Sequence, residues 1–472
     1  MNPAALANVK GLQVQLEGTV VFMDASFVRD CGPRDDCGPV AVQRDYGDGR
    51  VYRVNGEGRL TPDEENGFYA PTATNMGKYQ APSNVDGHAV TNGALPQGVP
   101  SLWASLNLDT FGLDGFAVGA AFYTPRAGDY AFHDDEYTRF TLIDRNLVEA
   151  YYSLSAAWRY RQWIAIGASL QGLSAGVEQR TKLSADPTGA ELPDYDITVH
   201  INTLTHLIPS GNLGVWSSPL PGLELGASVQ LGRSVAARGP VQLESFGPAI
   251  VELIDAGAVE IVEDNPTALS AFELPPFYRA GAKYLARDLF EGLFDLEVEA
   301  DFVYEPWSVY DHVYLETTGL STRLAGGDPT PLAPIVQPKD WQDAFSVRLG
   351  GEVTFLDGAV ALRSGAYYET DAIPSSTYSV DLMNGEQVGI GLGGSLALYG
   401  VRIDLGYGHA FLFDRVVGDE SIVHSEAVAQ PGGQPEPRTR IAMGRYATSY
   451  DVIGLALNLS LDELLGFGAA VR

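Results

Sequence analysis

Apolar and polar side chains alternate along segments of about ten residues, the length that a tilted β-strand needs to cross a membrane. The segment Phe294–Tyr304 has one apolar face and one acidic face, and the acidic face is made by Asp295, Glu297, Glu299 and Asp301. The segment Val452–Leu461 repeats the alternation with a second face of small and polar residues. Because successive side chains of a strand point to opposite sides, each segment is predicted to be a strand between two different environments.

About fourteen such strands are predicted, an even number as in single-chain bacterial membrane barrels. They are Leu12–Phe22, Leu102–Leu108, Gly115–Thr124, Tyr152–Trp158, Ile164–Gly172, Ser210–Ser218, Leu223–Leu231, Tyr278–Ala286, Phe294–Tyr304, Phe345–Phe355, Val360–Tyr368, Val388–Leu398, Val401–Phe411 and Val452–Leu461. The fold class is therefore all-β, a transmembrane antiparallel β-barrel.

Short and long links alternate between these strands. The short ones are Asp109–Asp114, Tyr160–Gln162, Pro219–Gly222, Arg287–Gly292, Leu356–Gly358 and Tyr399–Gly400. The long ones are Asp24–Gly98, Arg126–Leu147, Arg180–Pro209, Val235–Leu274, Pro306–Gln342, Thr370–Gln387 and Leu412–Thr448. Outer-membrane barrels have short periplasmic turns and long extracellular loops, whereas a soluble β-sandwich has no reason to gather its long links at one end.

Composition removes other classes of protein. The 472 residues carry a formal net charge of −30, which argues against nucleic acid as a partner. No run of about 18 apolar residues is present, and this excludes a bundle of membrane-spanning helices. The 53 Gly and 23 Tyr suit strands with tight turns and aromatic side chains at a membrane interface.

Cys31 and Cys37 are the only cysteines, and Gly32, Pro33 and Gly38 beside them favour a turn. We expect a small loop disulfide formed in an oxidising compartment, with two free thiols as the alternative and metal binding less favoured, because no His lies nearby. No signal peptide follows Met1, so either the chain is cytoplasmic or processed sequence precedes it.

The long links hold two further signals. Apolar residues of Phe246–Ile261 follow helical spacing, and Asn265-Pro266 is predicted to cap and begin a second helix. The first helix is expected either to roof the barrel or to help capture a ligand. Asp134, Asp135 and Glu136 are explained by a solvated loop tip, with a divalent-cation site as the weaker alternative. No metal or cofactor site is expected.

Several blocks of sequence together resemble the FadL/TodX-type family of outer-membrane transporters. They are NPAALANVKGLQV at the N-terminus, AVGAAFYTPRAGDY (Ala117–Tyr130), LPPFYRAGAKYL with LEVEADFVYEPWSVYD (Leu274–Asp311), and FSVRLGGEVTF through LRSGAYYETDAIPSSTYS (Phe345–Ser379). The pattern Tyr304, Trp307, Ser308, Asp311 and the loop around Ile373-Pro374 look especially like that family.

This resemblance implies a monomeric barrel in the outer membrane of a Gram-negative bacterium, in contact with its lipid and lipopolysaccharide. Residues 1–10 would end an N-terminal hatch, 11–461 would form the barrel, and 462–472 a C-terminal tail. Long-chain fatty acids or hydrocarbons would be caught in an apolar groove between loops 180–209 and 235–274, pass to an internal pocket, and leave sideways where the third strand is kinked.

The same resemblance assigns candidate residues to each step. Phe246, Ile250, Leu253 and Ile254 would offer the first apolar surface, and Phe122 and Tyr123 the internal one. Asn2 and Pro3 would hold the hatch junction. Pro125 is the best candidate for the kink, with Gly119 and Gly128 permitting the bend, although Pro125 could simply mark the end of a strand.

Three positions depart from the family pattern. Most of a hatch would have to precede Asn2, and the C-terminus LLGFGAAVR lacks a final aromatic residue. Ser174 stands where some members carry a basic residue for a fatty-acid carboxylate, which favours neutral hydrocarbons unless Arg180 or Arg126 substitutes.

Two other functions compete with this reading. Catalysis is not expected, because His88, His133, His200, His206, His312 and His424 fall in loops and His409 is better explained as a structurally paired side chain. A diffusion porin for polar solutes, preferring cations, is the alternative function, since the acidic face of Phe294–Tyr304 could line a water-filled channel. We favour pairing of those carboxylates with Arg348, Arg363 and Arg402.

Overall fold

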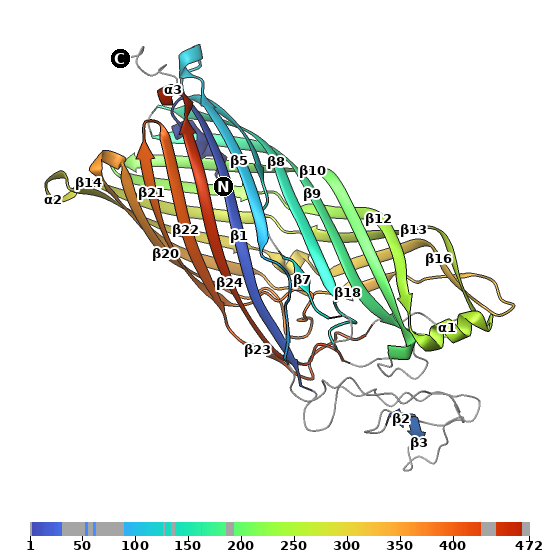
Figure 1. Ribbon diagram of the computed structural model, residues 1–472. Helices are drawn as coiled ribbons and strands as arrows, with labels where there is room; N and C mark the ends of the chain where they lie inside the picture. The colour runs from blue at the N-terminus through green and yellow to red at the C-terminus, as the bar shows by residue number, and fades with distance from the viewer. Residues whose placement is uncertain are drawn as a thin grey trace.

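The computed structural model describes residues 2–30, 52–54, 60–62, 89–125, 128–133, 137–161, 163–185, 193–425 and 440–464. These ranges contain a closed antiparallel β-barrel of fourteen strand positions (Figure 1). Cys31, Cys37, Arg126 and the acidic residues Asp134–Glu136 lie outside the described residues, so the expectations for them stay untested.

Eleven of the fourteen positions are each formed by one long strand, which at some positions is followed or preceded by a short one. They are β1 (Leu12–Arg29), β5 (Gln97–Asn107), β6 (Phe116–Tyr123), β8 (Asp144–Tyr160), β9 (Ile164–Ser184), β10 (Asp196–Leu220), β19 (Ala344–Phe355), β20 (Val360–Glu369), β21 (Gln387–Leu398), β22 (Val401–Leu412) and β24 (Gly444–Ser460). The other three are split into β11 (Leu223–Gln230) and β12 (Arg233–Phe246), β14 (Phe277–Asp288) and β13 (Val259–Leu274), and β15 (Phe294–Glu305) and β16 (His312–Leu324). Each of the fourteen predicted strands is confirmed, and several are longer than predicted.

Shorter elements complete the chain. The short strands are β2 (Tyr52–Val54), β3 (Leu60–Pro62), β4 (Ala89–Thr91), β7 (Tyr130–Ala131), β17 (Thr330–Pro331), β18 (Ile335–Pro338) and β23 (Arg415–Val417). The helices are α1 (Pro248–Asp255), α2 (Leu289–Gly292), α3 (Leu461–Leu464) and the 3₁₀ turns η1 (Pro3–Asn8), η2 (Asp109–Phe111), η3 (Pro193–Tyr195), η4 (Trp307–Val309) and η5 (Leu356–Gly358). No helix in the described part of the chain is long and apolar enough to cross a membrane.

The barrel closes where the first strand meets the last. β1 pairs with β24 in one unbroken register from Gln13 opposite Ser460 to Arg29 opposite Gly444. Along β1, Leu16 and Phe22 are 56% and 41% exposed, whereas Phe27 is buried, so even-numbered residues face outward and odd-numbered ones face the lumen. The alternation read from the sequence therefore separates an outer surface from an interior.

The outer surface is an apolar belt. Side chains that are more than half exposed gather on the strands, among them Leu16, Leu154, Ile166, Leu170, Leu349, Leu392, Leu405 and Leu455. A monomeric soluble protein rarely exposes an apolar patch of this extent, and a band of this kind is the lipid-facing surface of a transmembrane barrel.

Short turns lie at one end of the barrel and long links at the other (Figure 1). We call these the turn end and the loop end. At the turn end, β21 and β22 are joined by Tyr399–Gly400 alone, and Gly400 has φ +79°, a conformation that glycine adopts readily. The segment η1 and the helix α3 also lie toward this end (Figure 1).

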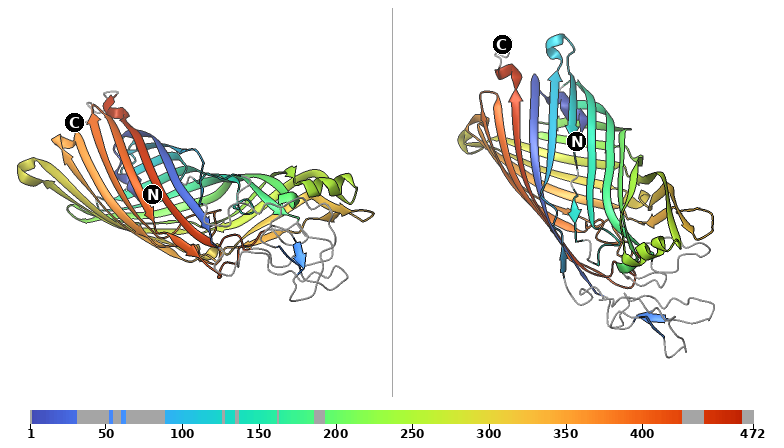
Figure 2. Two further views of the ribbon diagram at one scale, coloured as in Figure 1. Left: turned by 60° about the horizontal axis from the view of Figure 1, so that its bottom comes forward. Right: turned by 45° about the vertical axis from the view of Figure 1, so that its right-hand side comes forward.

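One side of the wall continues beyond the rest as an arm made of β9, β10, β12, β13 and β16, with α1 at its far end (Figures 1 and 2). The arm begins where three neighbouring strand positions break. The breaks fall at Leu231–Gly232, at Pro275–Pro276 and after Pro306. Proline lacks an amide donor, so two of the three breaks have a direct chemical cause.

The arm corrects three expectations. Most of 180–209 and of 235–274 is strand rather than irregular loop, because β9, β10, β12 and β13 extend the sheet. The predicted amphipathic helix is present as α1, although it is shorter than Phe246–Ile261. The second helix is wrong: Asn265 has φ +48° inside β13, where the register shifts between Glu263 and Thr267.

Candidate functional site

The loop end of the lumen is filled by a packed aromatic cluster. Phe27 stacks on Tyr446 with ring centroids 4.3 Å apart and meets the edge of Tyr137 at 5.4 Å. The Tyr137 hydroxyl donates to the carbonyl oxygen of Phe27 at 2.8 Å, and the Tyr446 hydroxyl donates to that of Ala442 at 2.6 Å. Because these rings are buried and their hydroxyls are hydrogen-bonded, they form a tightly packed layer on the inner wall at the loop end.

A second aromatic cluster lies at the base of the arm. Trp307 contacts Trp341 at 4.9 Å, Phe277 at 6.1 Å and Tyr310 at 6.1 Å between ring centroids. The Trp307 indole N–H donates to Glu305 Oε2 at 2.8 Å. The Tyr304-to-Asp311 pattern therefore places its tryptophan inside the protein, at the break between β15 and β16.

Three aromatic rings and one guanidinium group form a continuous stack along the inner face of the barrel wall. Tyr123 lies nearly parallel to Trp103 and to Tyr151, with ring centroids 5.2 and 5.1 Å apart. The Arg233 guanidinium lies over the Tyr151 ring at 4.9 Å. The Tyr123 hydroxyl accepts a hydrogen bond from Gln171 Nε2 at 2.8 Å. Tyr123 thus lines the lumen, where the sequence predicted it.

A buried ion pair continues this stack. Arg233 Nη2 lies 3.5 Å from Glu149 Oε1, and the Tyr151 hydroxyl donates to the same oxygen at 2.8 Å. The two charged side chains are 2% and 10% exposed. Because a buried carboxylate is costly unless paired and hydrogen-bonded, these contacts fix the ring of Tyr151 beside Tyr123.

The third strand position is interrupted beside the stack. β6 pairs with β8 until Tyr123 opposite Tyr151, and β7 resumes at Tyr130 opposite Arg145. Six residues of the third strand, 124–129, therefore stand opposite five of β8, 146–150. A strand that has one residue more than its partner between two paired positions forms a β-bulge, which locally disrupts the hydrogen bonds between the strands. We call residues 124–129 the wall interruption.

The second strand position is disturbed at the same level. It pairs with β1 at Thr91 opposite Ser26 and again at Gln97 opposite Val21, so the five residues 92–96 stand opposite four of β1. Leu95 in this stretch is 84% exposed, and Val148 on the outer face of β8 is 45% exposed. The two strands that flank the wall interruption thus each carry an exposed apolar side chain at this level.

The three predicted bend residues have different positions. Pro125 is exposed and Gly128 half-buried within the wall interruption. Gly119, by contrast, sits in regular register between Ser105 and Ser155 and lies outside the wall interruption. A Cβ on Gly119 would lie 3.3 Å from Leu6, which shows that its missing side chain makes room for the N-terminal segment.

The N-terminal segment packs inside the barrel. Asn2 Nδ2 donates to the Val215 carbonyl oxygen at 2.6 Å, and Asn2 Oδ1 accepts from the Ala4 amide at 3.0 Å. A Cβ on Gly167 would lie 2.5 Å from the Ala4 nitrogen and the Pro3 carbonyl carbon. Asn2 and Pro3 are therefore held against the wall by contacts with β9 and β10.

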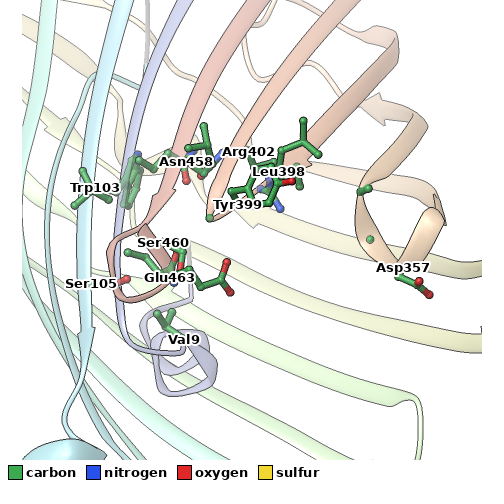
Figure 3. A pocket seen from close by; sticks show the side chains of 18 residues that line it. Val9, Trp103, Ser105, Asp357, Leu398, Tyr399, Arg402, Asn458, Ser460 and Glu463 are labelled. Carbon is green, nitrogen blue, oxygen red and sulfur yellow. Dashed lines mark hydrogen bonds between the residues drawn. The ribbon is translucent and has the colours of Figure 1, made fainter. Parts of the chain in front are cut away.

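The turn-end half of the lumen is polar. It holds cavities of about 520, 560 and 540 Å³. Figure 3 shows the first, which is lined by Trp103 from β5, Tyr399 and Arg402 around the β21–β22 turn, and Val9. Glu299, Asp301 and Arg348 line both of the others.

Ion pairs cross this polar half, though not those expected. Lys283 Nζ lies 3.4 Å from Glu297 Oε2 and 3.7 Å from Glu224 Oε2. Arg363 pairs with Glu352 and with Asp404, and Arg402 also pairs with Asp404 at 3.1 Å. Arg363 and Arg402 therefore neutralise carboxylates of β19 and β22 instead of those of β15.

The arm brings together three of the four predicted capture residues. Ile250 of α1 is buried in an apolar cluster with Ile197, Val199 and Val241, and Phe246 and Ile254 pack against its edge. Leu253 is 37% exposed and lies apart from that cluster.

Ser174 and Phe122 do not line the lumen. Leu173 belongs to the buried lumen cluster, so the next residue points to the other side, where Ser174 Oγ lies 3.3 Å from His206 Nδ1. Phe122 packs on Tyr152, which is 49% exposed on the outer surface, at 5.3 Å between ring centroids. Strand alternation places each side chain on the face opposite to its lumen-facing neighbour, and both expected positions are wrong.

His409 is paired, as expected, with Nδ1 at 2.8 Å from Asp451 Oδ1. Sequence reasoning missed Trp103, Tyr151 and Arg233. Trp103 lies in a predicted strand and Tyr151 directly precedes one. The alternation of side chains along those strands could have identified both as lumen-facing. Arg233 lies between the predicted strand Leu223–Leu231 and the long link that begins at Val235, and the sequence gives no such signal for it. Among the described residues, no group of three or more His, Cys, Asp and Glu side chains could hold a metal ion.

The barrel is similar in fold to solved transport proteins. The crystal structure of a Pseudomonas aeruginosa FadL homologue matches with a TM-score of 0.67 and 14% identity, covering 97% of this chain and 92% of that one. The Pseudomonas putida toluene transporter TodX gives 0.57 and 13%, covering 97% and 92%. The CymD monoaromatic hydrocarbon channel gives 0.54 and 14%, covering 98% and 91%. No protein-family model and no curated protein matches the sequence. The fold implied by the sequence resemblance is confirmed.

Proposed function

We propose that this barrel carries hydrophobic small molecules passively across the outer membrane. The observation that carries the proposal is the wall interruption, since a barrel of this fold has a break in its third strand beside an aromatic, lumen-facing stack. The similar structures described as a toluene transporter and as a monoaromatic hydrocarbon channel support the same substrate class. The chain works as a monomer surrounded by lipid and lipopolysaccharide, without a cofactor.

The proposed path begins at the arm. Phe246 and Ile254 are partly exposed where they pack on the apolar cluster that contains Ile250, and such a surface gains about 0.8 kcal/mol for each CH₂ group it removes from water. A solute held only by apolar contacts is not oriented by hydrogen bonds and can move on. Residues 180–209 and 235–274 would form the capture region in this scheme.

The path then leaves the barrel sideways. The cluster of Phe27, Tyr137 and Tyr446 narrows the lumen at the loop end, and η1 occupies part of it at the turn end. Tyr123 lies on the lumen side of the wall interruption and Val148 on the outer face of β8 beside it, so a solute passing there would meet aromatic and then aliphatic surface. Exit at this place would deliver a hydrophobic molecule directly into lipid.

Uptake into liposomes tests the proposal. The purified barrel is reconstituted and the entry of radiolabelled toluene and of radiolabelled oleate is compared with protein-free liposomes. Faster entry of either solute, with negligible ion conductance in the same preparation, supports hydrophobic transport. Entry no faster than into protein-free liposomes contradicts it.

A diffusion pore for polar solutes is the second candidate. The three turn-end cavities, each above 500 Å³, favour it, because Glu299, Asp301 and Arg348 line two of them and Arg402 the third. A water-filled lumen of this kind conducts ions. A large, steady conductance in planar bilayers without uptake of toluene or oleate would replace the first candidate by this one.

A further inference from the structure

Each of the six short links at the turn end exposes a bulky apolar side chain. In the β14–β15, β19–β20 and β21–β22 links, Phe290, Leu356 and Tyr399 are 78%, 72% and 92% exposed. The other three links carry exposed apolar side chains within or beside them, namely Phe111, Trp163 and Leu220. Turns are usually made of Gly, Pro, Asn, Asp and Ser, so this composition is unusual. We call these six side chains the turn ring.

The backbone makes three members of the turn ring costly. Phe290, Leu356 and Tyr399 have φ of +51°, +54° and +51°, in the left-handed region that a bulky side chain disfavours. Tyr399 and Gly400 form a two-residue turn with positive φ at both positions, for which Asn-Gly and Asp-Gly are the usual pairs. Because the three side chains are so exposed, packing within the barrel compensates little for this cost.

The turn ring continues the apolar belt of the outer wall. Next to the β5–β6 and β8–β9 links, Phe116 packs on Trp158 with ring centroids 6.1 Å apart, and Trp158 packs on Tyr160 at 5.8 Å. All three rings are exposed, and the Arg161 guanidinium lies over the Tyr160 ring at 5.3 Å. Aromatic rings and cationic side chains of this kind mark the level at which a barrel meets lipid headgroups. The lipid-facing surface thus reaches the ends of the strands.

The turn ring also surrounds the barrel. The six links join twelve of the fourteen strand positions, and the other two, β24 and β1, hold the chain ends. α2, which contains Phe290, and η2, which contains Phe111, lie on different sides of the turn end (Figures 1 and 2). A protein partner would cover one side of the barrel, whereas a lipid leaflet encloses all of it. The arrangement therefore favours lipid as the occupant.

We propose that the turn ring is embedded in the headgroup region of the periplasmic leaflet, so that phospholipid covers the turns as well as the strands. The inference concerns how the barrel sits in the membrane and does not depend on which solute it carries. Asp288, Glu291 and Asp357 are exposed beside the ring. These carboxylates suit the cationic groups of zwitterionic headgroups better than they suit an anionic lipid.

Photocrosslinking tests the turn ring in a bilayer. The photoreactive residue p-benzoylphenylalanine replaces Phe111, Phe290 or Tyr399 in the full chain, which is reconstituted into vesicles of phosphatidylethanolamine and phosphatidylcholine and irradiated. Leu349 in the apolar belt is the positive control, and Val336, exposed on β18 beside the arm, is the negative control. We expect lipid adducts at all three turn positions, about as many as at Leu349 and several-fold more than at Val336.

The possible outcomes separate lipid from a protein partner. Adducts at the turn positions that are no more frequent than at Val336 overturn the inference, and so do adducts confined to one side of the barrel. Crosslinks to another protein in place of lipid, when the same variants are irradiated in the outer membrane of the expressing cells, overturn it as well. Because the replaced side chains are exposed, the barrel should fold in every variant, and its gel mobility with and without heating checks this.

Discussion

Phe122 and Tyr123 are neighbours in the sequence, yet their rings lie on opposite faces of the barrel wall. Phe122 packs on the exposed Tyr152 outside, while Tyr123 stacks between Trp103 and Tyr151 inside. Because Tyr123 is also the last residue of β6 before the wall interruption, its ring forms the lumen-side edge of the proposed exit.

This pair allows a matched test of the stack. Tyr123→Leu removes two ring contacts, each contributing ~0.5–1.5 kcal/mol, and the hydrogen bond from Gln171. We expect a barrel that is less stable by ~1–3 kcal/mol and takes up toluene several-fold more slowly. Phe122→Leu should change both quantities little, since its ring lies on the outer surface. Thermal unfolding and uptake are measured for both variants, and equal effects would contradict a role of the inner stack.

The contact between η1 and the wall predicts a change in ion conductance. Gly167→Val places a side chain against the backbone of Pro3 and Ala4, which cannot yield as a flexible side chain does. We expect η1 to leave the wall, and conductance in planar bilayers to rise from negligible to measurable. Gly18→Ala is the control, because a Cβ at Gly18 meets nothing within 4 Å. Equal conductance of the two variants would show that η1 does not obstruct the lumen.

A buried ion pair in the loop end predicts a dependence on pH. Lys339 Nζ lies 2.7 Å from Asp381 Oδ2, the Ser379 hydroxyl also donates to this carboxylate, and the neighbouring positive charge lowers the pKa of Asp381 to about 2 even though burial opposes ionisation. A lowered folded-state pKa stabilises the fold above the unfolded value of ~4, and this stabilisation of about 2 kcal/mol is lost as the pH falls towards 2.

Limited proteolysis of the loop end at pH 6 and at pH 2.5 measures this dependence, with an acid-active protease at the lower pH. We expect cleavage after acidification in the parent and at both pH values in Lys339→Met, which removes the partner of Asp381. A Lys10→Met variant, exposed at the turn end, should behave as the parent does. Resistance of the Lys339 variant at pH 6 would contradict the assigned contribution of this pair.

The period of two along the sequence was sufficient to predict all fourteen strand positions, because lipid and lumen impose different side chains on the two faces. The same period places Phe122 with Phe116 and Val118, and Ser174 with Ile166 and Leu170, on the lipid side. Both side chains could have been placed correctly from the alternation along each strand, without using the resemblance to the family.

Other features could not be read from periodicity. The arm strands β12, β13 and β16 pair only with other strands of the arm. Their sequences lack the regular alternation of apolar and polar residues that a lipid-facing strand shows, and the sequence therefore predicts loops here. The bulge at the third strand depends on the register between Tyr123, Tyr130 and β8, which is a relation between distant segments.

The most direct test of the central claim removes the extra residue of the third strand. Deleting Pro125 leaves five residues opposite the five of β8 and restores an amide at every position, so the ladder can continue from Tyr123 to Tyr130 with both rings still facing the lumen. Pro125→Ala, which keeps six residues, is the control. If solutes leave through the wall interruption, the deletion variant folds as a barrel but takes up radiolabelled toluene no faster than protein-free liposomes, while Pro125→Ala still transports. Uptake by the deletion variant at the rate of the parent would contradict exit through the wall.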